Sequence, residues 1–103
     1  MPTVYVVNKS SHDYSLASEW GKLVFLSEGP MDKFAVNSMD RQFCERMKDS
    51  QPGDYILLTS LSVMNSLACV CFALKHRRLN LLIYKNKGYV ERQLVFNDLK
   101  EEK

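Results

Sequence analysis

Residues 54–84 read DYILLTSLSVMNSLACVCFALKHRRLNLLIY and hold three apolar segments separated by short polar breaks. Tyr55–Thr59 and Leu79–Tyr84 are brief, nearly unbroken apolar runs, and Ser60–Leu74 between them is long enough for a helix. Strands that are covered by helices on both faces are continuously apolar rather than alternating. The stretch therefore predicts a strand–helix–strand unit with parallel strands.

The rest of the chain continues this alternation. Further strands are predicted at Thr3–Val7, Lys22–Leu26 and Tyr89–Phe96, and further helices at Tyr14–Trp20 and Met39–Lys48. Ser11 or Asp13 would cap the first of these helices. Ser38 would cap the second, with Asp40 in its first turn. Spacings of three and four place Leu16, Ala17 and Trp20 on one buried helix face, and Met39, Phe43 and Met47 on another.

This order of elements predicts a three-layer, Rossmann-like α/β domain with a mainly parallel sheet. The simplest arrangement is the flavodoxin-like strand order 2-1-3-4 with right-handed crossovers. Residues 85–88 (KNKG) form a turn, with Asn86 and Gly88 available for positive φ, so the last strand is antiparallel and lies at the edge. Residues 1–97 would form this single domain, and 98–103 a solvated tail.

Composition limits the classes of function. A chain of 103 residues with 46% hydrophobic residues can bury a core without metals or disulfides. The net charge of +2 gives no general reason to expect nucleic-acid binding, and Leu61–Leu74 is too short to span a membrane. Basic residues do gather late in the chain, where they would cap a helix and protect a hairpin edge. They are Lys75, Arg77, Arg78, Lys85, Lys87 and Arg92.

The cysteines favour a reduced, cytoplasmic protein. Their odd number, three, argues against a disulfide framework, and buried thiols are the simplest interpretation. Cys69 and Cys71 lie two positions apart on a predicted helix, so their side chains diverge by roughly 200° and cannot chelate one ion. No metal site and no cofactor are predicted.

Candidate ligand-binding residues follow from the predicted sheet, because ligands of open parallel sheets bind beyond the carboxyl ends of the strands. If strands one and three are neighbours, the loops that follow them share one crevice. The candidates at this edge are Asn8, Lys9, Ser11, His12, Asp13, Glu28, Thr59, Ser60, Ser62, Asn65 and Lys85.

The polar start of the central helix, residues 59–65, is the strongest of these features. Free N–H groups and the helix dipole attract anions there, although Ser60 or Ser62 could simply cap the helix. Asn65 favours a ligand contact, because asparagine is a poor residue within a helix. Glu28 is either an acceptor for a ribose or base, or a solvated turn residue.

His12 is the one catalytic candidate. It could act as general acid or base in phosphodiester hydrolysis, with Asp13 to orient it. The alternative is that Asp13 caps a helix and His12 is an ordinary loop residue. His76 is predicted at the opposite edge of the sheet, so the two histidines would not share a metal site.

Four segments resemble small Rossmann-like α/β proteins of bacteriophage and metagenomic origin. They are VVNKSSHDYS (6–15), VFLSEGP (24–30), DYILLTSLSVMNSLAC (54–69) and RLNLLIYKN (78–86). The resemblance spans Val4 to Phe96 and implies a phage accessory protein acting in a bacterial cytoplasm. It implies no activity and no catalytic residue.

Three functional hypotheses remain. The first is binding of an anionic or nucleotide-like small molecule at the crevice, to sense or sequester it, with charge supplied by Lys9 and Lys85. The second is an interaction or homodimerisation module that uses the edge strand Tyr89–Phe96 and no small ligand. The third is phosphodiester hydrolysis by His12.

Overall fold

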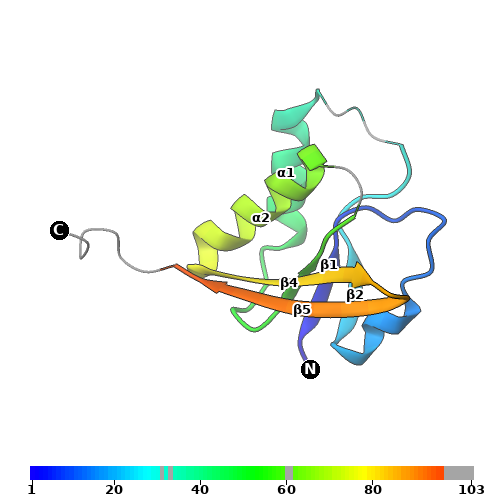
Figure 1. Ribbon diagram of the computed structural model, residues 1–103. Helices are drawn as coiled ribbons and strands as arrows, with labels where there is room; N and C mark the ends of the chain where they lie inside the picture. The colour runs from blue at the N-terminus through cyan, green and yellow to red at the C-terminus, as the bar shows by residue number, and fades with distance from the viewer. Residues whose placement is uncertain (31, 33, 60–61, 97–103) are drawn as a thin grey trace.

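The computed structural model describes residues 1–30, 32, 34–59 and 62–96. Ser60 and the predicted tail 98–103 lie outside these residues. The elements are β1 (Thr3–Val6), η1 (Ser15–Glu19), β2 (Lys22–Phe25), α1 (Val36–Arg46), β3 (Tyr55–Leu57), α2 (Ser62–His76), β4 (Arg78–Lys85) and β5 (Gly88–Val95). The predicted alternation of strands and helices is therefore confirmed (Figure 1).

The five-stranded sheet has the order β2-β1-β3-β4-β5. Strand β1 pairs in parallel with both β2 and β3, and β3 pairs in parallel with β4. Strand β5 is antiparallel to β4 and lies at the edge. Both the predicted flavodoxin-like order and the antiparallel edge strand are confirmed, and β1 and β3 are neighbours as the shared crevice requires.

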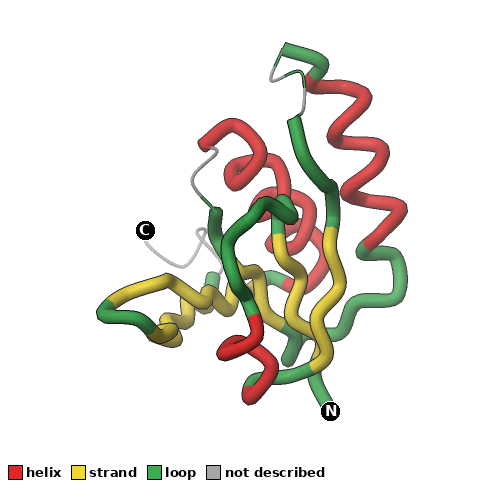
Figure 2. The backbone as a smooth tube through the Cα atoms, turned by 90° about the vertical axis from the view of Figure 1, so that its right-hand side faces the viewer, coloured by secondary structure: helices red, strands yellow, loops and turns green. Residues whose placement is uncertain are grey.

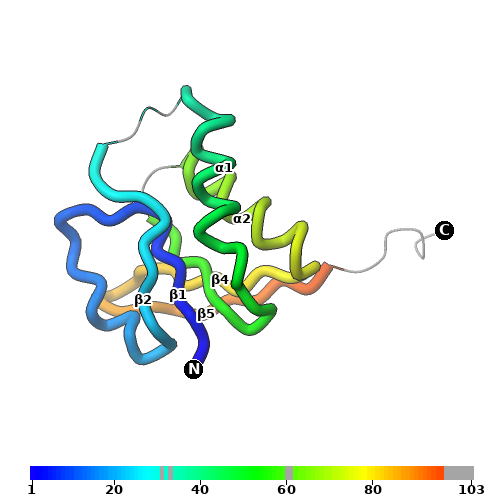
Figure 3. The backbone as a smooth tube through the Cα atoms, turned by 180° about the vertical axis from the view of Figure 1, so that it is seen from behind, coloured from blue at the N-terminus to red at the C-terminus, as the bar shows by residue number. Residues whose placement is uncertain are grey.

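The two faces of the sheet are covered unequally. Helices α1 and α2 lie side by side over one face (Figures 1 and 3) and enclose a core that includes Phe43 and Phe72. On the other face, the helical element among the described residues is the short helix η1, which lies below the sheet in Figure 1 and towards its lower end in Figure 2. Tyr14 and Ala17 pack there against Val6. The third layer is thus present but thin.

The first predicted helix is a 3-10 helix, not an α-helix over Tyr14–Trp20. With three residues per turn, Tyr14, Ala17 and Trp20 share one side, and Leu16 is 56% exposed. The predicted burial of Leu16 is wrong for this reason. The N-cap residue is Tyr14 rather than Ser11 or Asp13, although the Asp13 carboxylate does accept the Ser15 N–H at 2.9 Å.

Helix α1 begins earlier than predicted. Its N-cap is Ala35 and makes no side-chain cap, so the predicted cap at Ser38 and the first-turn position of Asp40 are wrong. A turn in which the Asp32 carbonyl accepts the Ala35 N–H at 3.0 Å starts the helix upstream of the predicted cap. The predicted core face is confirmed, because Met39, Phe43 and Met47 are all buried.

The β4–β5 hairpin closes through a two-residue turn. Asn86 and Lys87 have φ values of 53° and 64°, which is the left-handed conformation that such turns require. Lys85 pairs with Gly88, which opens β5, so Lys87 rather than Gly88 takes the second positive φ.

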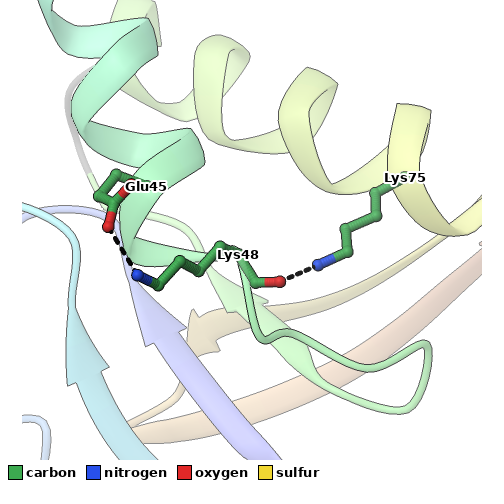
Figure 4. A network of polar contacts seen from close by, with 3 residues as sticks. All are labelled: Glu45, Lys48 and Lys75. Carbon is green, nitrogen blue, oxygen red and sulfur yellow. Dashed lines mark hydrogen bonds and ion pairs between the residues drawn. The ribbon is translucent and has the colours of Figure 1, made fainter.

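Lys75 joins α2 to the end of α1. Its ammonium group donates to the carbonyl oxygens of Met47 and Lys48, while the Lys48 ammonium pairs with Glu45 at 2.9 Å (Figure 4). A cation at the carbonyl end of a helix is favoured by the helix dipole. Lys75 thus lies in the last turn of its own helix, as predicted, and its ammonium group also caps the neighbouring helix.

The prediction of buried thiols is wrong for Cys44, which is exposed, and only partly correct for Cys69 and Cys71, which are half-buried. Within the described residues, no helix has the length and hydrophobicity needed to cross a membrane.

Candidate functional site

A cavity of about 490 Å³ opens at the carboxyl ends of β1, β3 and β4. Because β1 and β3 are adjacent, the loops that follow them meet at this crevice. The β4–β5 hairpin forms its remaining wall. The residues that line it are Asn8, Ser10, His12, Tyr14, Leu57, Leu58, Thr59, Asn65, Ile83, Tyr84 and Tyr89.

Aromatic side chains from three parts of the chain meet in this crevice. The His12 ring stands edge-on to Tyr14 and Tyr84, with centroids 4.9 and 4.8 Å apart. The Tyr89 hydroxyl lies 3.4 Å from His12 Nε2, and the Tyr84 and Tyr89 rings are 5.5 Å apart. These rings give the crevice flat apolar faces beside polar edges, a combination that suits a planar ligand.

Hydrogen bonds fix the loop that carries His12. The Tyr14 hydroxyl donates to the Asn8 carbonyl oxygen at 3.0 Å and lies 3.0 Å from Ser10 Oγ. Tyr14 is itself buried, and its ring meets Phe25 edge-on at 5.9 Å. Tyr14 thus helps to hold the loop after β1 against the sheet.

Burial raises the pKa of the Tyr89 phenol, and the nearby Tyr14, Tyr84 and Asp13 raise this pKa further. Tyr89 therefore keeps its proton at neutral pH and can act as a hydrogen-bond donor. It presents a neutral hydroxyl to the crevice.

Two buried or half-buried amides line the crevice. Asn8 is buried, with its Oδ1 atom 2.8 Å from the Ser27 hydroxyl. Asn65 binds the backbone of Thr59 twice, accepting its N–H at 3.1 Å and donating to its carbonyl oxygen at 2.6 Å. This contact ties Thr59, which follows β3, to the first turn of α2. It gives a structural reason for an asparagine within the helix, beside any contact with a ligand.

The structure brings four of the predicted site residues together. Asn8, His12, Thr59 and Asn65 line the crevice. The other described candidates do not line it. They are Lys9, Ser11, Asp13, Glu28, Ser62 and Lys85.

Lys9 and Glu28 are placed by local contacts outside the crevice. The Lys9 ammonium lies 5.1 Å from the centroid of the Phe25 ring, a cation–π contact. Residues 9 and 28 form a backbone bridge that continues the β1–β2 pairing. The Lys9 ammonium group therefore lies over the Phe25 ring and does not supply the predicted positive charge to the crevice.

Asp13 does not orient His12. The Ser15 N–H holds the pKa of the Asp13 carboxyl below its usual value, because it donates to the charged form. His76 lies at the end of α2, where its Nε2 atom is 2.8 Å from Ser50 Oγ. The histidine in the crevice thus has tyrosine partners among the described residues, and neither an orienting carboxylate nor a second histidine.

The tyrosines of the hairpin were missed by reasoning from strand ends. The sequence does contain the information needed to find them. In a hairpin with a two-residue turn at Asn86 and Lys87, residues that are equally far before and after the turn lie opposite each other. Tyr84 and Tyr89 are such a pair, and they lie directly across from each other in the sheet. Pairing across a predicted hairpin identifies ring positions that strand ends alone do not.

These features define an α/β sheet protein with an aromatic crevice at the carboxyl edge of its parallel strands. Residues 2–97 match the family described as "Phage Pam3 gp32-like protein", and the chain belongs to that family. The match supports the phage origin that the sequence resemblance implies. No curated protein and no solved structure gives a significant match.

Proposed function

We propose that the chain binds a small, nucleotide-like molecule in the crevice at the carboxyl edge of the sheet. The observation that carries this proposal is the convergence of His12, Tyr14, Tyr84 and Tyr89 on one cavity. Aromatic faces stack on any nucleobase, and the cavity has the size of ordinary small-molecule sites.

The polar residues of the crevice would bind the edges of the base and the sugar. Asn8 and Thr59 approach from the ends of β1 and β3, and the Tyr89 hydroxyl approaches from the hairpin. A phosphate would lie towards the start of α2, where the helix dipole favours negative charge. Because Lys9 and Lys85 do not line the cavity, stacking contributes more to this mode of binding than ion pairing.

In a phage setting, such a protein would sense or sequester a signalling nucleotide in the cytoplasm of the bacterial host. Binding alone is sufficient for either role. Hydrolysis of a phosphodiester by His12 has less support, because no described carboxylate orients its ring.

Tyr84→Ala is expected to weaken nucleotide binding roughly 5- to 150-fold, the range for loss of one stacked ring. Tyr84 is 49% exposed, so its replacement leaves the core intact. Trp20, the sole tryptophan, lies 6.5 Å from the Tyr89 ring and provides a fluorescence signal for titration with mono-, di- and cyclic nucleotides.

Tyr84→Phe is the matched control, because it keeps the ring and removes only the hydroxyl. It should bind within a few-fold of the unaltered chain. The proposal fails if no nucleotide changes the fluorescence or the melting temperature, or if Tyr84→Ala and Tyr84→Phe bind with equal affinity.

A second candidate is self-association through β5. This edge strand of eight residues carries exposed apolar side chains at Leu94 and Val95, which are 50% and 64% exposed. Unpaired strand edges of this kind add strands from a partner.

Strand pairing through β5 predicts a dimer in size-exclusion chromatography with light scattering. The double substitution Lys87→Glu and Arg92→Glu should then shift the mass towards that of a monomer, because it places new acidic groups beside Glu91 on both strands. A chain that stays monomeric at high concentration, with or without these changes, would exclude this candidate.

A further inference from the structure

A cluster of two thiols and one carboxylate lies between the two α-helices. Asp40 and Cys44 are one turn apart on α1, and Cys71 faces them from α2. Asp40 Oδ1 lies 3.3 Å from Cys71 Sγ and 3.8 Å from Cys44 Sγ, and the two sulfur atoms are 2.8 Å apart. The three groups belong to a part of the surface that shares no residue with the crevice.

We propose that Asp40, Cys44 and Cys71 bind a thiophilic divalent cation of the zinc class. Sulfur and oxygen ligands about 2.3 and 2.1 Å from a tetrahedral ion lie roughly 3.6 Å from each other. Both observed sulfur–oxygen distances are close to that value. The sulfur–sulfur distance must open by about 1 Å, which a small rotation of the exposed Cys44 side chain provides.

The ligand set suits such an ion, because two thiolates and one carboxylate together supply three anionic ligands. On binding, the cation forms two metal–sulfur bonds and the two thiols release their protons to solvent. The carboxylate is the third ligand and water completes the tetrahedron.

Neighbouring cations do not occupy this role. Lys48 and Lys75 border the same surface, but the Lys48 ammonium pairs with Glu45, and the Lys75 ammonium binds carbonyl oxygens at the end of α1 (Figure 4). No ion pair to Asp40 occurs in the part of the chain that the structure describes. Cys44 is exposed, so a cation reaches the cluster directly from solvent.

A metal explains the cluster better than a disulfide does. Closing a Cys44–Cys71 bond requires an acceptor for two electrons, which the described residues do not supply. Metal binding requires neither an oxidant nor a reductant. It also gives Asp40 a purpose that a disulfide would not.

Titration of the reduced full-length chain with Co²⁺ tests the proposal. One cobalt per chain should produce a sulfur-to-cobalt charge-transfer band in the near ultraviolet, and zinc should abolish it. Cys44→Ser, Cys71→Ser and Asp40→Asn should each weaken Co²⁺ binding by more than about 10-fold, because even the loss of a group that only supports a ligand costs about 10- to 100-fold. Cys69→Ala is the matched control and should leave both the band and the affinity unchanged.

Circular dichroism of each variant shows whether it folds, and the exposed position of Cys44 makes its substitution the least disruptive. The absence of a charge-transfer band overturns the proposal, as does an unchanged Co²⁺ affinity in folded Cys44→Ser. Counting the free thiols after exposure to air distinguishes the metal site from a Cys44–Cys71 disulfide. Three reactive thiols agree with the proposal, whereas one reactive thiol assigns the pair to a disulfide and overturns it.

Discussion

Asn80→Ala is expected to lower the free energy of unfolding by about 2–5 kcal/mol. Asn80 is 1% exposed, and its Nδ2 group donates to the carbonyl oxygens of Pro52 and Asp54, both at 2.7 Å. Removing the amide leaves two acceptors without their donor and opens a cavity beside β4. Urea unfolding followed by circular dichroism measures the loss.

We expect this large loss of unfolding free energy because Asn80 holds the Pro52–Asp54 loop, which in turn supports two strands. The buried Asp54 carboxylate accepts the Thr3 N–H at 2.9 Å and the Gln51 N–H at 2.8 Å, so this loop fixes the starts of both β1 and β3. Asn80→Asp keeps the size of the side chain and loses both donated hydrogen bonds, so it should destabilise at least as much. Exposed Asn37→Ala is the control and should change stability by less than about 0.5 kcal/mol. A small loss in both Asn80 variants would contradict this account.

Gly21→Ala is expected to cost about 2–4 kcal/mol of stability. A Cβ atom at this position would lie 2.2 Å from the Pro2 carbonyl oxygen and 2.7 Å from its carbon. These are backbone atoms, and the same oxygen accepts the Lys22 N–H at 3.0 Å where the β1–β2 pairing begins. The methyl group can be accommodated only if the two strands separate at this end.

Gly53→Ala provides the comparison for Gly21→Ala. A Cβ atom at Gly53 meets nothing within 4 Å, so alanine there should be neutral or stabilise by up to about 1 kcal/mol through the unfolded state. Thermal and urea unfolding of the two variants should therefore differ by several kcal/mol. Equal stabilities would show that the close approach of Pro2 to Gly21 does not constrain the fold.

The sheet could be predicted because several independent features of the sequence, each confined to a short segment, indicate the same strand arrangement. The apolar runs around Ile56 and Leu82 are continuous, and the alternation of strands with helical segments leaves few allowed topologies. The position of β5 at the edge follows from the turn at residues 85–88 and from the alternating, charged sequence after it.

The start of α1 and the 3-10 type of the first helix were harder to predict from the sequence, because they depend on which local hydrogen bonds form. Helix α1 begins at Val36 because a turn at Asp32 precedes it, whereas residue type alone favours Ser38 as the cap. Leu16 is exposed because five residues form a 3-10 helix, whose period of three differs from the α-helical period.

The candidate site could be located by the rule of strand ends, but its chemistry could not be predicted that way. The rule identified Asn8, His12, Thr59 and Asn65 correctly as neighbours. It also favoured the cations Lys9 and Lys85, whose long side chains are free to turn away from the edge. The rings of Tyr84 and Tyr89 enter through hairpin pairing, which depends on the geometry of a turn rather than on the end of a strand.

The pairing of Asn65 with the Thr59 backbone has a consequence for how members of this family diverge. The Asn65 side chain satisfies both an N–H and a carbonyl group of the main chain, so its loss should cost stability whether or not the crevice binds a ligand. Tyr84 contributes to the crevice without holding any backbone group among the described residues, so under the proposed function it could change together with the ligand. If the crevice binds a ligand as proposed, position 65 should follow the ancestry of the fold across relatives, while position 84 should vary with the ligand.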